Sequence, residues 1–144
     1  MDPLSITASI IATIQLTGKV TSILWGLRSA VQGAKGDIAR IIGDVNSLRT
    51  ILEALVNLVE TVDREAPSFL STWRILSAPD GPIQKCQAEL KALEALLQFT
   101  DKHGLKHFTK PFQWFVKKDD ANRRLEALAK IKSTLQLALT TDHM

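Results

Sequence analysis

The chain of 144 residues is 45% hydrophobic and 23% charged, has a formal net charge of +3, and contains one cysteine and three histidines. This composition excludes an intrinsically disordered chain, and the length fits one domain, which we place at residues 1–144. Cys86 excludes an internal disulfide because it is the single cysteine, and the scattered histidines do not form the ligand cluster of a structural zinc site. We expect a reducing, intracellular location and no cofactor.

The first 31 residues predict one long helix that is apolar on most of its surface. Pro3 stands where a helix can begin, and no charged residue occurs between Asp2 and Lys19. One side of this helix carries Ile6, Ile10, Ile14, Val20, Leu24 and Leu27, and the weakly polar strip carries Ala8, Gln15, Lys19, Ser22 and Gly26. Such a helix either forms the centre of a core or enters a membrane. Residues 3–18 alone, about 24 Å long as a helix, are short for a hydrocarbon core of about 30 Å.

A second long helix and a short third one are predicted next. Gly33 and Gly36 indicate the end of the first helix, and Asp37 is expected to cap the second. The apolar positions of the second helix are Ile38, Ile41, Val45, Leu48, Leu52, Leu55, Val59 and Val62. A second apolar edge predicts that this helix touches two neighbours. Residues 68–77 predict a short helix that ends at a turn rich in proline and glycine at 78–82.

Two more helices complete the predicted fold. The fourth is expected to begin at Pro82 and to bury Ile83, Cys86, Leu90, Leu93 and Leu97, with Cys86 interpreted as a small buried hydrophobic residue. The fifth is expected to begin at Asp119 and Asp120 and to bury Leu125, Leu128, Ile131, Leu135 and Leu139. Strand signals are poor. The fold class is therefore all-α, an antiparallel bundle of about five helices with a long hydrophobic N-terminal helix.

Residues 102–118 differ from the rest of the chain in charge. They contain five lysines and no acidic residue, interleaved with aromatic residues, and Gly104 and Pro111 are expected to interrupt any long helix. Three interpretations stay open: a solvated loop, a patch that binds a membrane surface, and a nucleic-acid site. No nucleic-acid motif is present, so we expect no nucleic-acid partner. The candidate patch consists of Lys102, Lys106, Lys110, Trp114, Lys117 and Lys118.

Motifs of catalysis are missing from the sequence. It has no glycine-rich phosphate loop, no nucleophile elbow and no metal-binding helix motif. No acid or histidine stands near Cys86 in a triad-like pattern. We therefore expect a protein that is not an enzyme.

The first 12 residues, MDPLSITASIIA, followed by QLT at 15–17, closely resemble the start of fungal HeLo-like domains. These are N-terminal domains of fungal NOD-like (STAND) receptors and related cell-death proteins. DGPI at 80–83, QWF at 113–115 and LQLAL at 135–139 also look like that family. The chain departs from the family where Val116 follows Trp114 and Phe115, since the family often has Trp-Pro-Phe there.

The resemblance implies a helical bundle akin to the four-helix bundle of the mixed lineage kinase domain-like pseudokinase, with a role in regulated cell death and non-self recognition. It further implies that a C-terminal sensor, nucleotide-binding or amyloid segment drives self-association, and that the N-terminal helix then moves from a cytoplasmic bundle into the plasma membrane. The inserting residues implied in this sequence are Leu4, Ile6, Ile10, Ile11, Ile14 and Leu16. The chain is expected to be the N-terminal domain of a longer protein.

Two hypotheses for the function follow from these observations. The leading one is a membrane-targeting, pore-forming domain that acts on anionic lipids, held at the surface by residues 102–118. The alternative is a helical signalling or oligomerisation module that recruits partners and never enters a membrane.

Overall fold

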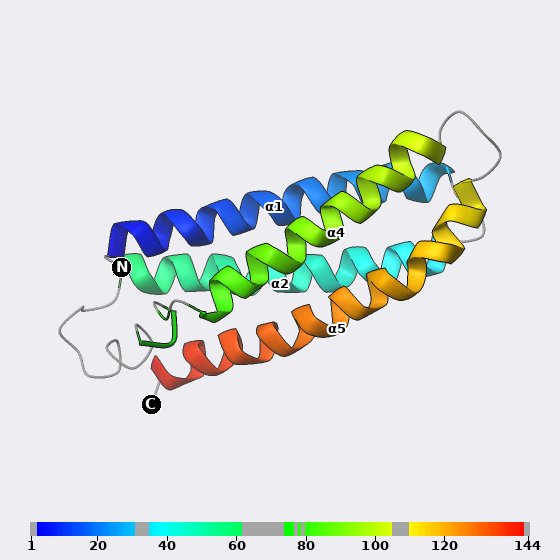
Figure 1. The fold of residues 1–144 in the computed structure, drawn as a ribbon. Helices are drawn as coiled ribbons and strands as arrows, with labels where there is room; N and C mark the ends of the chain where they lie inside the picture. The colour runs from blue at the N-terminus through cyan, green and yellow to red at the C-terminus, as the bar shows by residue number, and fades with distance from the viewer. Residues whose placement is uncertain are drawn as a thin grey trace.

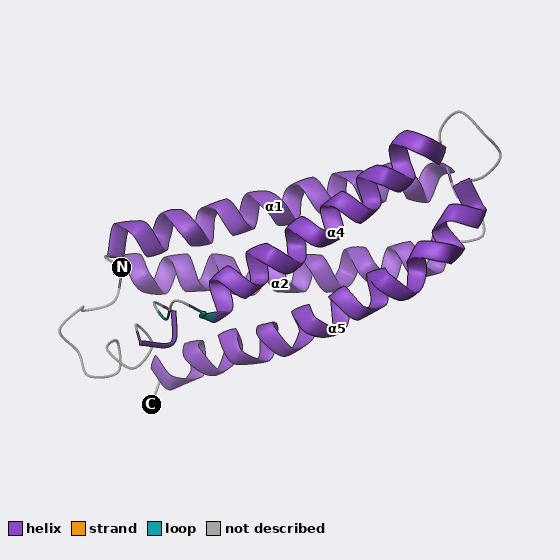
Figure 2. Cartoon of the chain, viewed as in Figure 1, coloured by secondary structure: helices purple, strands orange, loops and turns teal. Residues whose placement is uncertain are grey.

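The computed structural model describes residues 3–30, 35–61, 74–76, 78, 80–104 and 110–142. Its long helices are α1 (Pro3–Ala30), α2 (Lys35–Thr61), α4 (Pro82–Gly104) and α5 (Lys110–Asp142), and residues 74–76 are also helical (Figure 1). The part of the chain that is described contains no strand (Figure 2). The predicted all-α antiparallel bundle is confirmed.

The four long helices form a ring in which each packs mainly against two others. α1 packs against α2 and α4, and α5 also packs against α2 and α4. α1 with α2, and α4 with α5, are antiparallel hairpins, whereas α1 and α4 run in the same direction (Figure 1). α2 and α5 also run in the same direction, since their contacts advance together along both helices: Asp37 with Lys118, Arg40 with Asn122, and Ser47 with Lys132.

The core consists of one apolar line from each long helix. Every residue predicted for the inner line of α4 is buried, and so is the predicted line of α2 from Ile38 to Val59. Val62 lies outside the described residues. In α5 the predicted line is buried from Leu125 to Leu135, and Leu139 is partly buried. The spacing of three and four residues therefore predicted the inner faces of these helices correctly.

The buried line of α1 differs from the predicted one at its centre. It contains two threonines, Thr13 and Thr17, both with no exposed surface, while the predicted Ile14 is only partly buried. The full line is Ile6, Ile10, Thr13, Thr17, Val20, Leu24 and Leu27. These positions keep the spacing of four and three residues that a straight seam between helices requires. The spacing alone would have found both threonines.

Two predicted helix boundaries are wrong. α5 begins at Lys110 and not at Asp119. Pro111 lies in its first turn, where a missing N–H costs no intrahelical hydrogen bond, so this proline helps to begin the helix. Gly36 lies inside α2 and not at the end of α1, and the described glycines have no positive φ.

The turn before α4 depends on Gly81. Its N–H donates a hydrogen bond to the carbonyl oxygen of Ala78 at 2.8 Å, and its own carbonyl accepts one from the N–H of Lys85 at 3.1 Å. A Cβ at this position would lie 2.7 Å from the oxygen of Ala78, so a larger residue would force the turn to shift. This turn sets the start of α4 beside the start of α1.

Candidate functional site

The residues predicted to enter a membrane occupy several sides of α1. Ile6 and Ile10 are fully buried, and Ile14 and Leu16 are partly buried against the core. Ile11 is 41% exposed and faces outward. The side chain of Leu4 lies outside the described residues. The structure therefore places these residues on one helix but not on one face of it.

Threonine hydroxyls of α1 bond to the backbone of α1 itself. Thr13 Oγ1 donates to the carbonyl oxygen of Ser9 at 2.7 Å, and Thr17 Oγ1 donates to that of Ile14 at 2.5 Å. Thr21 Oγ1 donates to the carbonyl oxygen of Thr17 at 2.8 Å. These hydroxyls keep their partners wherever the helix goes, since a helix carries its own carbonyl groups. Their burial, in protein or in lipid, leaves no unpaired hydroxyl.

The outward face of α1 contains no acidic residue. It consists of Ser5, Ala8, Ile11, Ala12, Gln15, Lys19, Ser22, Trp25 and Gly26. Trp25 is 49% exposed, and the guanidinium carbon of Arg28 lies 5.0 Å from the centroid of its ring, within the range of a cation–π contact. The other three long helices all carry Asp or Glu on exposed or half-exposed positions. The weakly polar strip predicted from the sequence is confirmed as the exposed side of this helix.

One described helix is long and apolar enough to cross a membrane. The segment runs from Ser5 to Arg28, and about a third of its apolar window is buried in the bundle. The core helix of a soluble protein passes the same test of length and composition. The segment is longer than the uncharged stretch at 3–18, because it continues past Lys19.

The described ends of the basic segment, which are the last residues of α4 and the first residues of α5, lie at the opposite end of the bundle from the start of α1. The end of α4 and the start of α5 lie beside the end of α1 (Figure 1). α1 contains 28 residues, so its two ends are roughly 42 Å apart. Lys118 Nζ lies 2.9 Å from Asp37 Oδ2, and both side chains are about one-third exposed. The side chains of the other predicted patch members, Lys102, Lys106, Lys110, Trp114 and Lys117, lie outside those described.

Cys86 is buried on the inner line of α4. Burial raises the pKa of its thiol to about 12, so the thiol stays protonated at neutral pH. Among the described residues there is no group of three or more potential metal ligands. Cys86 therefore belongs to the core.

Two hollows flank α5. A cavity of about 80 Å³ between α2 and α5 is lined by Asp44, Val45, Leu48, Leu125, Leu128, Ala129 and Lys132. An open groove of about 550 Å³ lies between α4 and α5, with Lys85 and Lys130 among its lining residues. The groove was not anticipated from the sequence, since it depends on how the two helices pack.

Comparison with known proteins identifies the family of this chain. No curated protein and no solved structure matches it. The family model for the N-terminal region of the pigment biosynthesis cluster protein PigL matches residues 1–144. The chain thus belongs to the PigL N-terminal domain family.

Proposed function

We propose that this domain is a membrane-targeting, pore-forming effector of regulated cell death that acts without enzymatic chemistry. In this proposal the domain is HeLo-like, is cytoplasmic at rest, and self-associates when a sensor, nucleotide-binding or amyloid segment in the same chain or a partner chain activates it. α1 then enters the plasma membrane. The proposal is carried by α1 itself, whose segment Ser5–Arg28 is apolar, lacks acidic residues and bonds its buried threonine hydroxyls internally.

The length of this segment supports a spanning role. It contains 24 residues and is about 36 Å long as a helix, against a hydrocarbon core of about 30 Å. Lys19 lies near its middle and costs about 2.5–3.5 kcal/mol on insertion scales. Self-association lowers this cost, because a lysine in an oligomer can face a water-filled pore. Insertion is therefore expected to depend on oligomerisation.

The outward face of α1 supports the first contact with anionic lipid. Lys19 and Arg28 meet no acidic neighbour on their own helix, and each basic residue near an anionic leaflet contributes about 1 kcal/mol. Trp25 is of the residue type that prefers the membrane interface. The lysines of residues 102–118 provide a second attachment at the end of the bundle where α1 finishes. The interpretation of residues 102–118 as a patch that binds a membrane surface is therefore part of this proposal.

Leakage of a dye from anionic liposomes tests the proposal, with the domain as it is and with the domain forced to oligomerise. Gln15→Lys places a second charge near the middle of the segment at an exposed position, so the resting fold is expected to persist. Leakage should fall at least about tenfold, because the added charge lies one turn from Lys19 on the same side of the helix and doubles the like charge that each helix brings into the membrane or the pore. The matched control is Gln136→Lys, an exposed position of α5. If neither form of the wild-type domain permeabilises liposomes, or if Gln15→Lys leaks like wild type, the proposal is wrong.

A second candidate function is a helical module that recruits a protein partner. The exposed Ile11 and Trp25 favour it, since exposed apolar side chains on one helix can form the centre of a protein interface. In this case Ile11→Lys abolishes partner binding, and the wild-type domain does not associate with liposomes. The matched control is Leu137→Lys, because Leu137 is 61% exposed on α5.

A further inference from the structure

Two of the four helix–helix contacts in the ring join helices that are not linked by a short loop. α1 and α2 are joined through residues 31–34, and α4 and α5 through residues 105–109, so these pairs are held as hairpins. The two hairpins meet along α1 with α4 and along α2 with α5. We call these contacts the α1–α4 seam and the α2–α5 seam. Any opening of the ring must occur at one of them.

The α1–α4 seam is closed by apolar packing. The inner residues of both helices, among them Leu24, Leu27, Leu90 and Leu97, have at most 3% of their surface exposed. Gln87 Nε2 also donates a hydrogen bond to the carbonyl oxygen of Ser9 at 3.0 Å. The packing of α1 against α4 is more extensive than that of α2 against α5, so opening this seam would bring more apolar surface into water.

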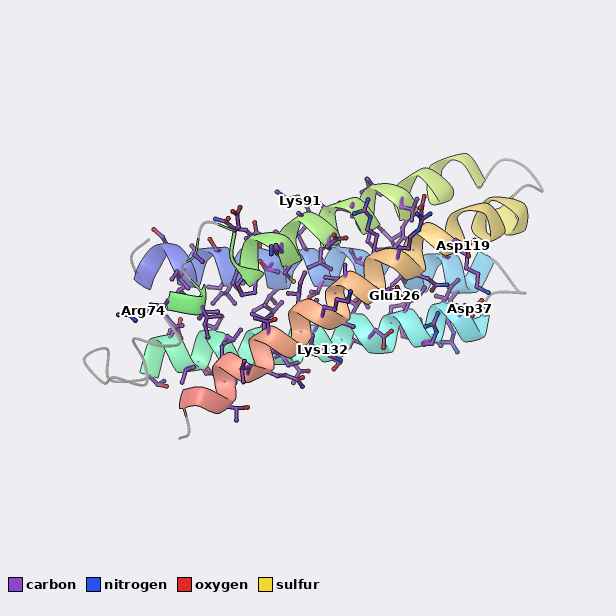
Figure 3. The ribbon with its side chains drawn as sticks, turned by 60° about the horizontal axis from the view of Figure 1, so that its bottom comes forward. Asp37, Arg74, Lys91, Asp119, Glu126 and Lys132 are labelled. Atoms are coloured by element: carbon purple, nitrogen blue, oxygen red, sulfur yellow. The ribbon has the colours of Figure 1, made fainter. Side chains whose placement is uncertain are left out.

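The α2–α5 seam is closed differently. Polar side chains bridge it at Asp37 with Lys118, at Arg40 with Asn122 (3.0 Å) and at Ser47 with Lys132 (3.3 Å). Figure 3 views the bundle from the side on which α5 lies over α2, with Asp37 and Lys132 labelled. Lys132 also lines the cavity of about 80 Å³ between α2 and α5, and two further lining residues, Leu125 and Leu128, keep 8% and 5% of their surface exposed. Bridges of this kind are exposed to solvent and weakened by salt.

We infer that the resting bundle opens at the α2–α5 seam, and that the polar bridges between residues 37–47 and 118–132 act as its latch. Opening there leaves α1 packed against both α2 and α4, so α1 and α4 become the two middle helices of an open layer. Its buried face, with Ile6 and Ile10, is then uncovered without extraction of the helix. The inference depends on the proposed function in one respect only, which is that opening is the step before α1 inserts. The opening itself is a property of the bundle in water.

A thiol-reactivity measurement without membranes tests the opening. Val45→Cys is a conservative change at a residue that lines the cavity and is 1% exposed, and Cys86→Ala removes the native thiol so that only the introduced one reacts. We expect the reaction rate of this thiol to rise with NaCl and with Lys118→Met, but not with the control Arg123→Met, which removes an ion pair that stays within α5. A rate that responds to neither NaCl nor Lys118→Met would mean that only global unfolding exposes the thiol, and would overturn the inference.

Cross-linking then connects the seam to the proposed function. The pair Ser47→Cys and Lys132→Cys, joined by a flexible, reducible bis-maleimide, locks the α2–α5 seam. The matched control pair, Glu89→Cys and Arg124→Cys, joins α4 to α5 where a native ion pair of 3.1 Å spans them. Selective labelling is possible because Cys86 has no exposed surface in the closed bundle.

Leakage should fall at least about tenfold in the protein locked across α2 and α5, return after reduction, and stay at the wild-type level in the control. Equal leakage from the two locked proteins overturns the inference. If wild type does not leak, the proposed function fails, while the thiol measurement still decides whether this seam opens.

Discussion

The α1–α4 seam and the α2–α5 seam join the same two hairpins with different chemistry. Both contain buried aliphatic side chains, but the first packs more extensively, and polar bonds at the surface bridge the second beside a small cavity. Burial of an aliphatic side chain contributes about 1.5–3 kcal/mol, whereas an exposed ion pair contributes about 0–1 kcal/mol. The comparison teaches that the first seam contributes more to the stability of the fold, while part of the closure of the second depends on bonds that salt weakens.

The largest expected effect comes from the same truncation made at both seams. Leu90→Ala removes a fully buried side chain of α4, and we expect the free energy of unfolding to fall by an amount near the upper part of the usual range of about 2–5 kcal/mol. For Leu125→Ala, at a residue that is 8% exposed beside the cavity, the free energy of unfolding should fall by an amount near the lower part of that range. Urea unfolding followed by circular dichroism measures both. A larger loss for Leu125→Ala would reverse the comparison.

A pH titration of stability measures how well water is excluded from the inner line of α4. The thiol of Cys86 has a pKa of about 12 in the folded state against an ordinary value of 9.0. A raised folded-state pKa leaves stability unchanged below about pH 9 and lowers it from pH 9 toward 12, because the unfolded chain loses the proton first. The slope is about 1.4 kcal/mol per pH unit. The variant Cys86→Ala should lack this part of the loss of stability at alkaline pH. The contribution of the thiol is therefore the difference between the free energies of unfolding of wild type and variant, measured against pH. If the two dependences on pH are parallel, the thiol is hydrated in the folded state.

The smallest effect is expected at the latch itself. Lys118→Met removes the ion pair with Asp37 but keeps an apolar stem, so the free energy of unfolding should change by less than about 1 kcal/mol at low salt and by less still at high salt. The matched control is Arg123→Met, which removes an ion pair with Asp120 that stays within α5. A loss above about 2 kcal/mol for Lys118→Met would mean that the bridge carries much of the fold's stability.

Much of the fold could be predicted because helical periodicity is a local signal. The inner lines of α2 and α4 follow from aliphatic residues three and four positions apart, and Cys86 on such a line is buried as expected. The prediction for α1 failed because of residue type, at two positions that the spacing itself includes. Thr13 and Thr17 look like surface residues, yet they are buried because their hydroxyls bond to the helix backbone. The start of α5 was misplaced because Pro111 is tolerated in a first turn.

The sequence by itself determined that the chain forms long helices, that α1 is apolar on most of its surface and free of acidic residues, and that basic charge gathers at residues 102–118. These properties belong to single segments. Only the tertiary structure decided which helices are neighbours, that α2 lies beside α5, and that Lys118 pairs with Asp37 and not with solvent alone. These outcomes depend on contacts between residues far apart in the chain, which local periodicity does not encode.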